Sequence, residues 1–218
     1  MDVTPILDGL NDAQRQAVTA PSEPTLVIAG AGSGKTRVLV HRAAWLIDVE
    51  GVSPQGLLAV TFTNKAAAQM RSRIETLLKV PVQHLWIGTF HGLAHRMLRR
   101  HWREAKLPQN FQIIDSDDQL RLIKRLFKSL EIDDSRFAPK EVQWFINGQK
   151  DEGLRPQHID DEGDADRRQL VSLYQSYEDV CQRGGLVDFA ELLLRAHELL
   201  RDNAELLQHY RRRFQHLL

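Results

Sequence analysis

The 218-residue chain has a single cysteine and no apolar run approaching the roughly 18 residues that a membrane-spanning helix needs. One thiol cannot close an intramolecular disulfide, and such scarcity is typical of a reducing compartment. The N-terminal segment MDVTPILDGLND is acidic and lacks the basic and apolar regions of a secretory signal. These absences exclude a disulfide-stabilised secreted scaffold and a membrane-spanning chain, and they predict a cytoplasmic location.

An excess of charge is also missing, because 29 basic residues balance 29 acidic ones. The total therefore neither favours nor opposes a nucleic-acid partner. The charges are separated locally, since residues 96–106 are mainly basic and residues 151–166 are mainly acidic. Either run is compatible with an ordinary solvated face. The mean hydropathy of −0.38 is typical of a folded chain, and the length allows one large or two small domains.

Strand and helix patterns alternate along residues 1–90. Three apolar runs predict strands at 25–30, 57–62 and 85–90. Two segments between them predict helices, namely residues 36–49 and the stripe Ala67, Met70, Ile74 and Leu77. Strands that alternate with helices of this length form parallel sheets with helical crossovers. The sequence therefore predicts an α/β fold with a parallel sheet.

After residue 90 the apolar residues recur mainly at helical spacing. The stripes are Leu120, Ile123, Phe127 and Leu130; Leu170, Leu173, Tyr177 and Val180; and Phe189, Leu192, Leu193, Ala196 and Leu200. Ser116 with Gln119, and Asp188 with Glu191, have the spacing of capping boxes. Residues 111–114 are a candidate short strand. The single thiol, Cys181, lies beside a stripe and is interpreted as a core residue rather than a nucleophile or ligand.

The segment AGAGSGKT, residues 29–36, follows a predicted strand and precedes a predicted helix. It matches the phosphate-loop pattern GxxxxGK[ST], except that Ala29 occupies the first position. Gly30, Gly32 and Gly34 allow the backbone N–H groups to turn inward around an anion at a helix N-terminus. Lys35 then reaches the β- and γ-phosphates, and the Thr36 hydroxyl binds Mg²⁺. A solvated lysine in the first helical turn would oppose the helix dipole, which disfavours the alternative reading.

Five sequence blocks in a fixed order extend this motif. They are LNDAQRQAV (10–18), AGAGSGKTRVL (29–39), AVTFTNKAAAQMRSRI (59–74), IGTFHGLAHRMLR (87–99) and GLVDFAELLLRAHELL (185–200). Together they resemble the superfamily-one DNA helicases of the UvrD/Rep/PcrA type. The resemblance implies a partial RecA-like P-loop NTPase sheet with an inserted helical accessory domain. It also implies an ATP-dependent 3′ to 5′ DNA helicase acting in DNA repair or replication, with ATP and Mg²⁺ as cofactors.

The resemblance assigns nucleotide-binding roles to ten residues: Gln14, Ala29, Gly30, Ala31, Gly32, Ser33, Gly34, Lys35, Thr36 and Arg37. Lys35 and Thr36 are also the expected catalytic residues, and Thr36 is the expected Mg²⁺ ligand. Gln14 corresponds to the glutamine that reads adenine in the family, although Asn11 and Gln14 also have capping-box spacing. Arg37 resembles an arginine that packs beside the nucleotide, although a surface arginine of a helix would look the same.

The resemblance also predicts contacts with single-stranded DNA at two strand ends. The residues are Phe62, Thr63, Asn64, Thr89, Phe90 and His91. An aromatic ring offers a stacking surface for a base, while hydroxyl and amide groups bind backbone phosphate. Thr63 would also serve as a helix N-cap and Phe62 as a core residue. The implied partners are single-stranded DNA and its junctions with duplex, with other repair or replication proteins as candidates and no membrane.

An apolar strand that ends in Asp-Glu, which ATP hydrolysis by this family requires, is not visible in the sequence. Asp188 follows only two apolar residues and is interpreted as an N-cap. We therefore expect an N-terminal fragment that is not catalytically competent alone. The expected domains are the front half of the first motor domain (1–90), the helical accessory domain (91–214) and a return toward the motor domain (215–218). The alternatives are a complete P-loop phosphotransferase or ATPase unrelated to DNA, and a non-catalytic interaction module.

Overall fold

The structure, a computed structural model, describes residues 3–79, 82, 84–132, 137–161 and 163–218. The chain forms two compact units. The first comprises the residues up to Leu93 together with Ala204–Leu218, and the second comprises Ala94–Asn203. The sequence-based division places residues 204–214 in the helical domain, whereas the structure groups them with the first unit. The helices in the described part of the chain are too short or too polar to cross a bilayer.

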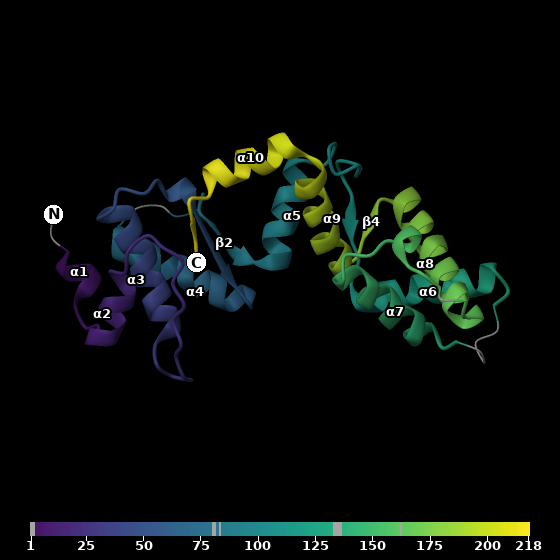
Figure 1. Ribbon diagram of the computed structural model, residues 1–218, viewed down its shortest axis with the longest axis horizontal. Coiled ribbons are helices and arrows are strands. Elements are labelled where there is room, and N and C mark those ends of the chain that lie inside the picture. Colours follow the sequence, from purple (N-terminus) through teal and green to yellow (C-terminus); the bar gives the residue numbers. More distant parts are fainter. Residues whose placement is uncertain (1–2, 80–81, 83, 133–136, 162) are drawn as a thin grey trace. The chain divides into compact units, whose positions relative to one another are not determined.

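The first unit combines helices with a small parallel sheet. Its helices are α1 (Thr4–Leu7), α2 (Asp12–Val18), α3 (Lys35–Asp48), η1 (Pro54–Gly56), α4 (Asn64–Leu78) and α10 (Ala204–Arg213), and α5 (Phe90–Arg100) begins in it. Its strands are β1 (Leu57–Thr61), β2 (Trp86–Thr89) and β5 (His216–Leu217). Figure 1 shows α1 and α2 beside α3, in agreement with their contacts. The helices predicted at 36–49 and after residue 62 are confirmed as α3 and α4.

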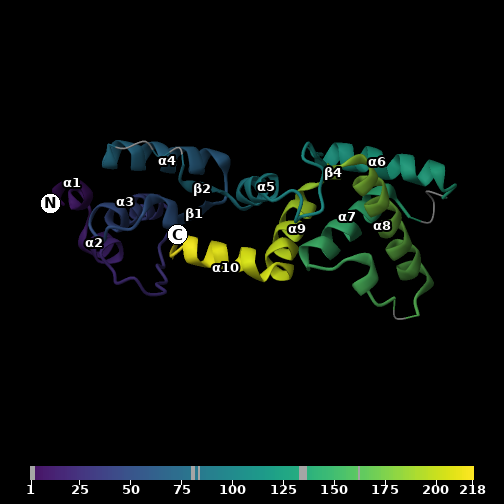
Figure 2. The same cartoon turned by 90° about the horizontal axis from the view of Figure 1, so that it is seen from above.

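The sheet has the strand order β2-β1-β5, and both pairings are parallel. The register joins Thr61 to Thr89 and Leu57 to His216. Figure 2 shows the C-terminus beside β1, where β5 pairs with it. The predictions of strands at 57–62 and 85–90 and of a parallel α/β sheet are therefore confirmed.

The strand predicted at residues 25–30 is wrong. This segment has no regular secondary structure, and the side chains of Leu26 and Ile28 are 85% and 91% exposed. A β-strand is defined by hydrogen bonds to a neighbouring strand. The sheet order β2-β1-β5 does not include this segment, which finds no strand partner among the described residues. Its apolar composition alone was therefore misleading.

The core of the first unit lies between α3, α4 and the sheet. Its fully buried members include Ala43 and Leu46 of α3, Ala59 of β1, and Met70 and Ile74 of α4. Met70 and Ile74 belong to the apolar stripe that the helical spacing predicted. The packing holds the start of α3 and the start of α4 in one body, which positions the glycine-rich loop and the ends of β1 and β2.

The second unit is mainly helical. Its elements are β3 (Gln112–Ile113), α6 (Ser116–Ser129), α7 (Pro139–Asp151), η2 (Pro156–His158), α8 (Ala165–Gly184), β4 (Leu186–Val187) and α9 (Phe189–Asp202). Figure 1 shows α6, α7 and α8 gathered together. The short strand predicted at 111–114 is confirmed as β3, which pairs with β4 in parallel. The N-cap of α6 is Asp115 rather than Ser116, because the carboxylate of Asp115 accepts a hydrogen bond from the N–H of Asp118.

A buried ionic cluster joins α7, α8 and α9; we define it as Lys150, Arg155, Glu178, Asp188, Glu191, Arg195 and Glu198. Lys150 Nζ donates to Asp188 Oδ2 at 2.8 Å and lies 3.0 Å from Glu191 Oε2. Arg155 donates two parallel hydrogen bonds to Glu191, both at 2.9 Å. Asp188 also accepts from the N–H of Glu191 at 2.7 Å, which confirms it as the N-cap of α9. The acidic residues of the block 185–200 therefore form ion pairs inside this unit.

Cys181 of α8 is buried in the apolar core of the second unit, as the sequence predicted. Burial raises the pKa of its thiol to about 12, because the thiolate would be desolvated there. We expect no reaction with a thiol-specific reagent at pH 8 in the folded chain and complete reaction after denaturation. A colorimetric thiol assay, with and without denaturant, measures this. Rapid reaction of the folded chain would contradict the assignment of Cys181 to the core.

Candidate nucleotide-binding and DNA-contact sites

The glycine-rich loop leads directly into α3. Gly34 is the N-cap of this helix, with a left-handed φ of +87°, and Gly32 has a φ of +76°. A residue with a Cβ atom is strained at such a left-handed φ, so glycine is needed at both positions. The first helical hydrogen bond runs from the N–H of Val38 to the carbonyl of Gly34. The N–H groups of Lys35, Thr36 and Arg37 therefore lack helical acceptors and are available to an anion, whereas that of Ser33 donates to the carbonyl of Gly30 at 3.4 Å.

Lys35 turns its side chain back over the loop. Its Nζ donates to the carbonyl oxygens of Gly30 at 2.7 Å and Ala29 at 3.2 Å. The Ser33 hydroxyl also donates to the Gly30 carbonyl, at 2.8 Å. The first turn of α3 holds Lys35 and Arg37 but no acidic residue, so cations face the positive end of the helix dipole. This arrangement favours an anionic ligand.

Thr36 follows Lys35 in the same turn and is partly buried. Within the described part of the chain, its hydroxyl makes no hydrogen bond. Mg²⁺ prefers oxygen ligands, and phosphates supply several of them when a nucleotide is bound. A free hydroxyl oxygen beside a phosphate-binding loop can supply another. The residues present therefore fit Mg²⁺ bound together with a nucleotide.

Gln14 lies against the loop. Its Nε2 donates to the carbonyl of Ser33 at 3.0 Å, and a Cβ added to Gly34 would come within 2.8 Å of that nitrogen. Gln14 also forms a capping box with Asn11, because each side chain accepts a hydrogen bond from the other residue's N–H. The structural role that the spacing predicted is present, and the amide also borders the loop. Adenine reading by Gln14 stays a prediction.

Arg37 lies over the turn between α1 and α2. A Cβ added to Gly9, whose φ is +69°, would lie 2.8 Å from Nη2 of Arg37. The left-handed φ at position 9 favours glycine, and a side chain there would displace the guanidinium of Arg37. The packing of Arg37 beside a nucleotide stays a prediction.

The predicted DNA-contact residues meet at one edge of the sheet. Thr61 and Thr89 are register partners, so Phe62 and Phe90 follow equivalent positions of neighbouring strands. Both rings face solvent, with exposed fractions of 97% and 63%. The Thr89 hydroxyl lies 3.5 Å from Asn64 Oδ1, which links the two segments directly. The alternative reading of Phe62 as a core residue is wrong.

Thr63 and His91 complete this edge. The Thr63 hydroxyl accepts a hydrogen bond from the N–H of Ala66 at 3.1 Å, so the predicted N-cap role is confirmed. His91 is the second residue of α5 and is exposed. Among the described residues no hydrogen bond joins this edge to the phosphate loop. The structure thus forms two groups of candidate residues in the first unit.

Part of the basic run 96–106 has a structural role. Arg99 donates to the carbonyl oxygens of Gln109 and Phe111 and lies 3.8 Å above the Phe111 ring. Its donors are therefore engaged within the second unit. The sequence did not reveal this role, because the acceptors are backbone carbonyls ten or more residues away.

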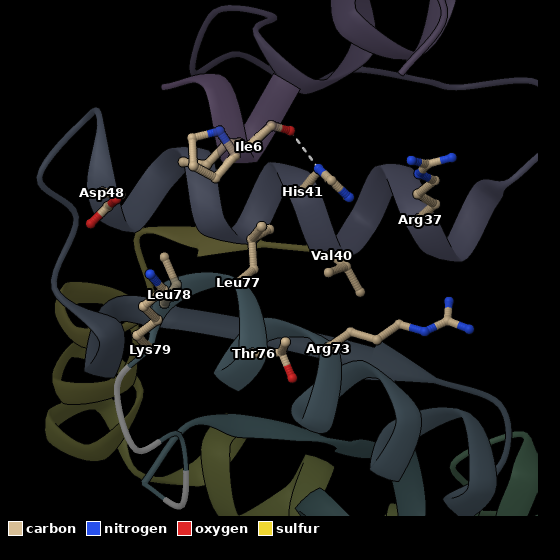
Figure 3. A pocket seen from close by; sticks show the side chains of 11 residues that line it. Ile6, Arg37, Val40, His41, Asp48, Arg73, Thr76, Leu77, Leu78 and Lys79 are labelled. Carbon is tan, nitrogen blue, oxygen red and sulfur yellow. Dashed lines mark hydrogen bonds between the residues drawn. The ribbon is translucent and has the colours of Figure 1, made fainter. Parts of the chain in front are cut away.

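A cavity of about 720 Å³ between α1, α3 and α4 is not evident from the sequence. Figure 3 shows its lining residues. Arg73, Thr76 and Leu77 of α4 line it at helical spacing, as do Arg37, Val40 and His41 of α3. That spacing is the signal available in the sequence, but it does not show which two helices face each other.

Comparison with known proteins identifies the class of protein. The family model described as UvrD/REP helicase N-terminal domain matches residues 10–218. The chain therefore belongs to the UvrD/REP helicase family. It is 58% identical over 218 residues to DNA helicase II of Escherichia coli (strain K12), covering 100% of this chain and 30% of that protein. It is 38% identical over 213 residues to the ATP-dependent DNA helicase PcrA of Bacillus subtilis (strain 168), covering 97% of this chain and 29% of that protein.

Proposed function

We propose that this chain is the ATP- and single-stranded-DNA-binding N-terminal portion of an ATP-dependent DNA helicase that moves 3′ to 5′. The observation that carries the nucleotide part is the loop before α3, where two left-handed glycines precede a basic, acid-free helical turn. The names of the relatives, DNA helicase II and ATP-dependent DNA helicase PcrA, support the DNA part. Because the chain spans about 30% of those relatives, the activity of a whole protein is part of the proposal.

In this proposal the loop residues 29–34 surround the phosphates with N–H groups, and Lys35 moves from the carbonyls of Ala29 and Gly30 to the β- and γ-phosphates. Gln14 reads the adenine edge, and Arg37 packs beside the nucleotide. Thr36 holds Mg²⁺, which neutralises charge on the phosphates when bound. These 218 residues include no apolar strand that ends in Asp-Glu, so we expect binding without turnover.

The proposed DNA site is the strand edge that bears Phe62 and Phe90. Their rings stack with bases, while Thr63, Asn64, Thr89 and His91 contact the sugar-phosphate backbone. The substrate includes junctions of single-stranded and duplex DNA. We place the protein in the cytoplasm, in DNA repair or replication.

The experiment that tests this function measures Mg·ATP binding and turnover by the chain, with and without single-stranded DNA. Binding of both ligands without turnover is the expected result. Turnover that does not respond to DNA would favour a complete phosphotransferase or ATPase. Absence of Mg·ATP binding would contradict the proposal and favour an interaction module.

Phe62→Ala is expected to weaken single-stranded DNA binding by about 5- to 150-fold, because stacking contributes ~1–3 kcal/mol per base. Nucleotide binding should stay unchanged, since Phe62 belongs to the strand edge. Fluorescence anisotropy with a labelled oligonucleotide measures the affinity. The matched control is Trp144→Ala, which removes another exposed ring, 70% exposed, from α7 of the second unit. An equal loss in both variants would show that Phe62 has no specific role.

A further inference from the structure

The second unit contains a cavity of about 530 Å³ beside the buried ionic cluster. Its walls come from α8, α9, the segment 155–157 and the residues that follow α5. Glu178 and Glu198 of the cluster line it, and their side chains are partly exposed there. A volume of this size is within the range of small-molecule sites. The cavity therefore gives a solute access to part of the cluster.

The carboxylate of Glu198 has hydrogen-bonding capacity left over in this cavity. Arg155 uses all five of its N–H donors on the carboxylates of Glu178, Glu191 and Glu198. Each oxygen of Glu198 accepts one of these hydrogen bonds and, within the part of the chain that the structure describes, no other. Because a carboxylate oxygen has two lone pairs, Glu198 can accept further hydrogen bonds from a donor in the cavity.

The cavity also has an excess of negative charge. The ionic cluster combines four carboxylates with three cations, so one negative charge in it is not balanced. The cavity lining adds Glu104, Asp202 and Lys106. Asp202 is paired with Arg201, which does not line the cavity, so Glu104 and Lys106 offset each other. An additional cation in the cavity is therefore favoured, most strongly beside the partly buried Glu198.

The carboxylates are spread along the cavity and do not converge on one point. Among the described residues, no group of three or more His, Cys, Asp or Glu side chains is placed to hold a metal ion. Glu198 and Asp202 lie one turn apart on α9, about 6 Å between Cβ atoms, and Glu104 belongs to another wall. Leu199 and Pro156 add apolar surface to the lining. This arrangement fits a flexible chain with several positive groups better than a compact metal ion.

We propose that this cavity binds an aliphatic polyamine, which is a chain of methylene groups that carries several ammonium groups. One ammonium group donates to the remaining lone pairs of Glu198, and the others lie at Glu104 and Asp202. The methylene groups pack on Leu199 and Pro156. Hydrogen bonds between an ammonium group and a carboxylate are charge-assisted and stronger than neutral ones. The site shares no residue with the proposed nucleotide and DNA sites, so this inference does not depend on the proposed function.

The test is a calorimetric titration of the 218-residue chain with spermidine, in the absence of DNA and nucleotide. We expect Glu198→Gln to weaken binding by about tenfold, because it removes the charge of the most buried contact. Glu104→Gln should weaken binding by about threefold, since that carboxylate is more exposed. The matched control is Glu152→Gln, because Glu152 is an exposed acid of the second unit that does not line the cavity. It should stay within about 1.5-fold of the unaltered chain.

Two further measurements define the ligand. Diacetylspermidine, which keeps the chain but has lost both terminal charges, should bind at least tenfold more weakly than spermidine. Replacing sodium ions by Mg²⁺ at constant ionic strength should change the affinity for spermidine by less than about twofold, because the carboxylates do not converge on a metal ion. Lys35→Ala should bind spermidine like the unaltered chain, which separates this site from the phosphate loop.

Several results would overturn the inference. They are no binding of spermidine, an equal loss in Glu104→Gln and Glu152→Gln, and displacement of spermidine by Mg²⁺ at constant ionic strength. Tighter binding of a lysine-rich peptide than of spermidine would assign the cavity to a protein partner instead. Thermal unfolding shows whether Glu198→Gln is folded. If it is not, the exposed position of Glu104 makes Glu104→Gln the deciding variant.

Discussion

Replacing Lys35 by alanine is expected to remove measurable binding of Mg·ATP. The ammonium group already lies among the loop carbonyls, at 2.7 Å from that of Gly30, so it can exchange these acceptors for phosphate oxygens with a small movement. A hydrogen bond from a charged donor contributes about 1.5–3 kcal/mol, and its loss lowers affinity by up to ~150-fold. We expect the isolated chain to bind nucleotide weakly, so a decrease of this size places the dissociation constant beyond the accessible range.

The control for this experiment is Lys65→Ala. Lys65 is also an exposed lysine in the first turn of a helix, α4, but it follows the strand edge rather than the glycine-rich loop. Titration with a fluorescent ATP analogue should give the unaltered affinity for Lys65→Ala. Retention of nucleotide binding by Lys35→Ala would contradict the assignment of residues 29–36 as a phosphate loop.

The second large effect is expected for Lys150→Met in the buried ionic cluster. The side chain of Lys150 is 1% exposed and lies within 2.8–3.0 Å of oxygens of Glu178, Asp188 and Glu191. Removal of the Lys150 ammonium group leaves these buried carboxylates without enough positive charge to balance them. Breaking a buried ion pair in this way costs about 3–5 kcal/mol of unfolding free energy. Chemical denaturation followed by circular dichroism measures the change.

Arg168→Met provides the matched control for Lys150→Met. Arg168 also forms an ion pair, with Asp161 at 2.7 Å, but its side chain is 64% exposed. Exposed pairs of this kind contribute at most about 1 kcal/mol. A cost for Lys150→Met no larger than that of Arg168→Met would show that the cluster does not hold the second unit together.

The same cluster predicts a dependence of stability on pH. Burial alone would raise the pKa of Glu191, but Lys150, Arg155 and Arg195 outweigh it and hold the pKa well below the ordinary 4.5. The stabilisation from Glu191 is therefore complete above about pH 4.5 and is lost as the pH falls toward its folded-state value. Burial likewise opposes the charge of Lys150, but Glu191, Asp188 and Glu178 raise its pKa well above 10.5. The stabilisation from Lys150 is thus complete below that pH and is lost as the pH rises through its folded-state pKa.

The sequence predicted the local elements of the first unit better than their pairing. Helical spacing located α3 and α4, and apolar runs located β1 and β2, because those patterns reflect which side chains are buried. Residues 25–30 have the same composition as a strand but pair with none in the described structure. Strand pairing depends on which strand edges are free in the folded sheet. A run of apolar residues in the sequence does not indicate which edges are free.

The candidate sites were likewise predictable where their residues are close in sequence, and not where they depend on how helices pack. The loop at 29–36 was predictable because its glycines, lysine and threonine are contiguous, and the strand edge followed from the rule that parallel strands end together. The position of Arg73 opposite α3 depends on how two helices pack, and no short motif encodes it. The ionic cluster combines residues from α7, α8 and α9 with Arg155, so its sequence signal was restricted to the Asp188 cap.

The pairing of β1 with β5 has a consequence for the synthesis of this protein. All of the second unit lies between β2 and β5 in the chain, so it leaves the ribosome before the strand that completes the sheet of the first unit. During that interval the edge of β1 at Leu57 and Leu58 has backbone N–H and C=O groups without their final partner. Such an edge is open to pairing with another nascent chain. A chaperone that covers this edge until His216 and Leu217 emerge would therefore protect the newborn protein from aggregation.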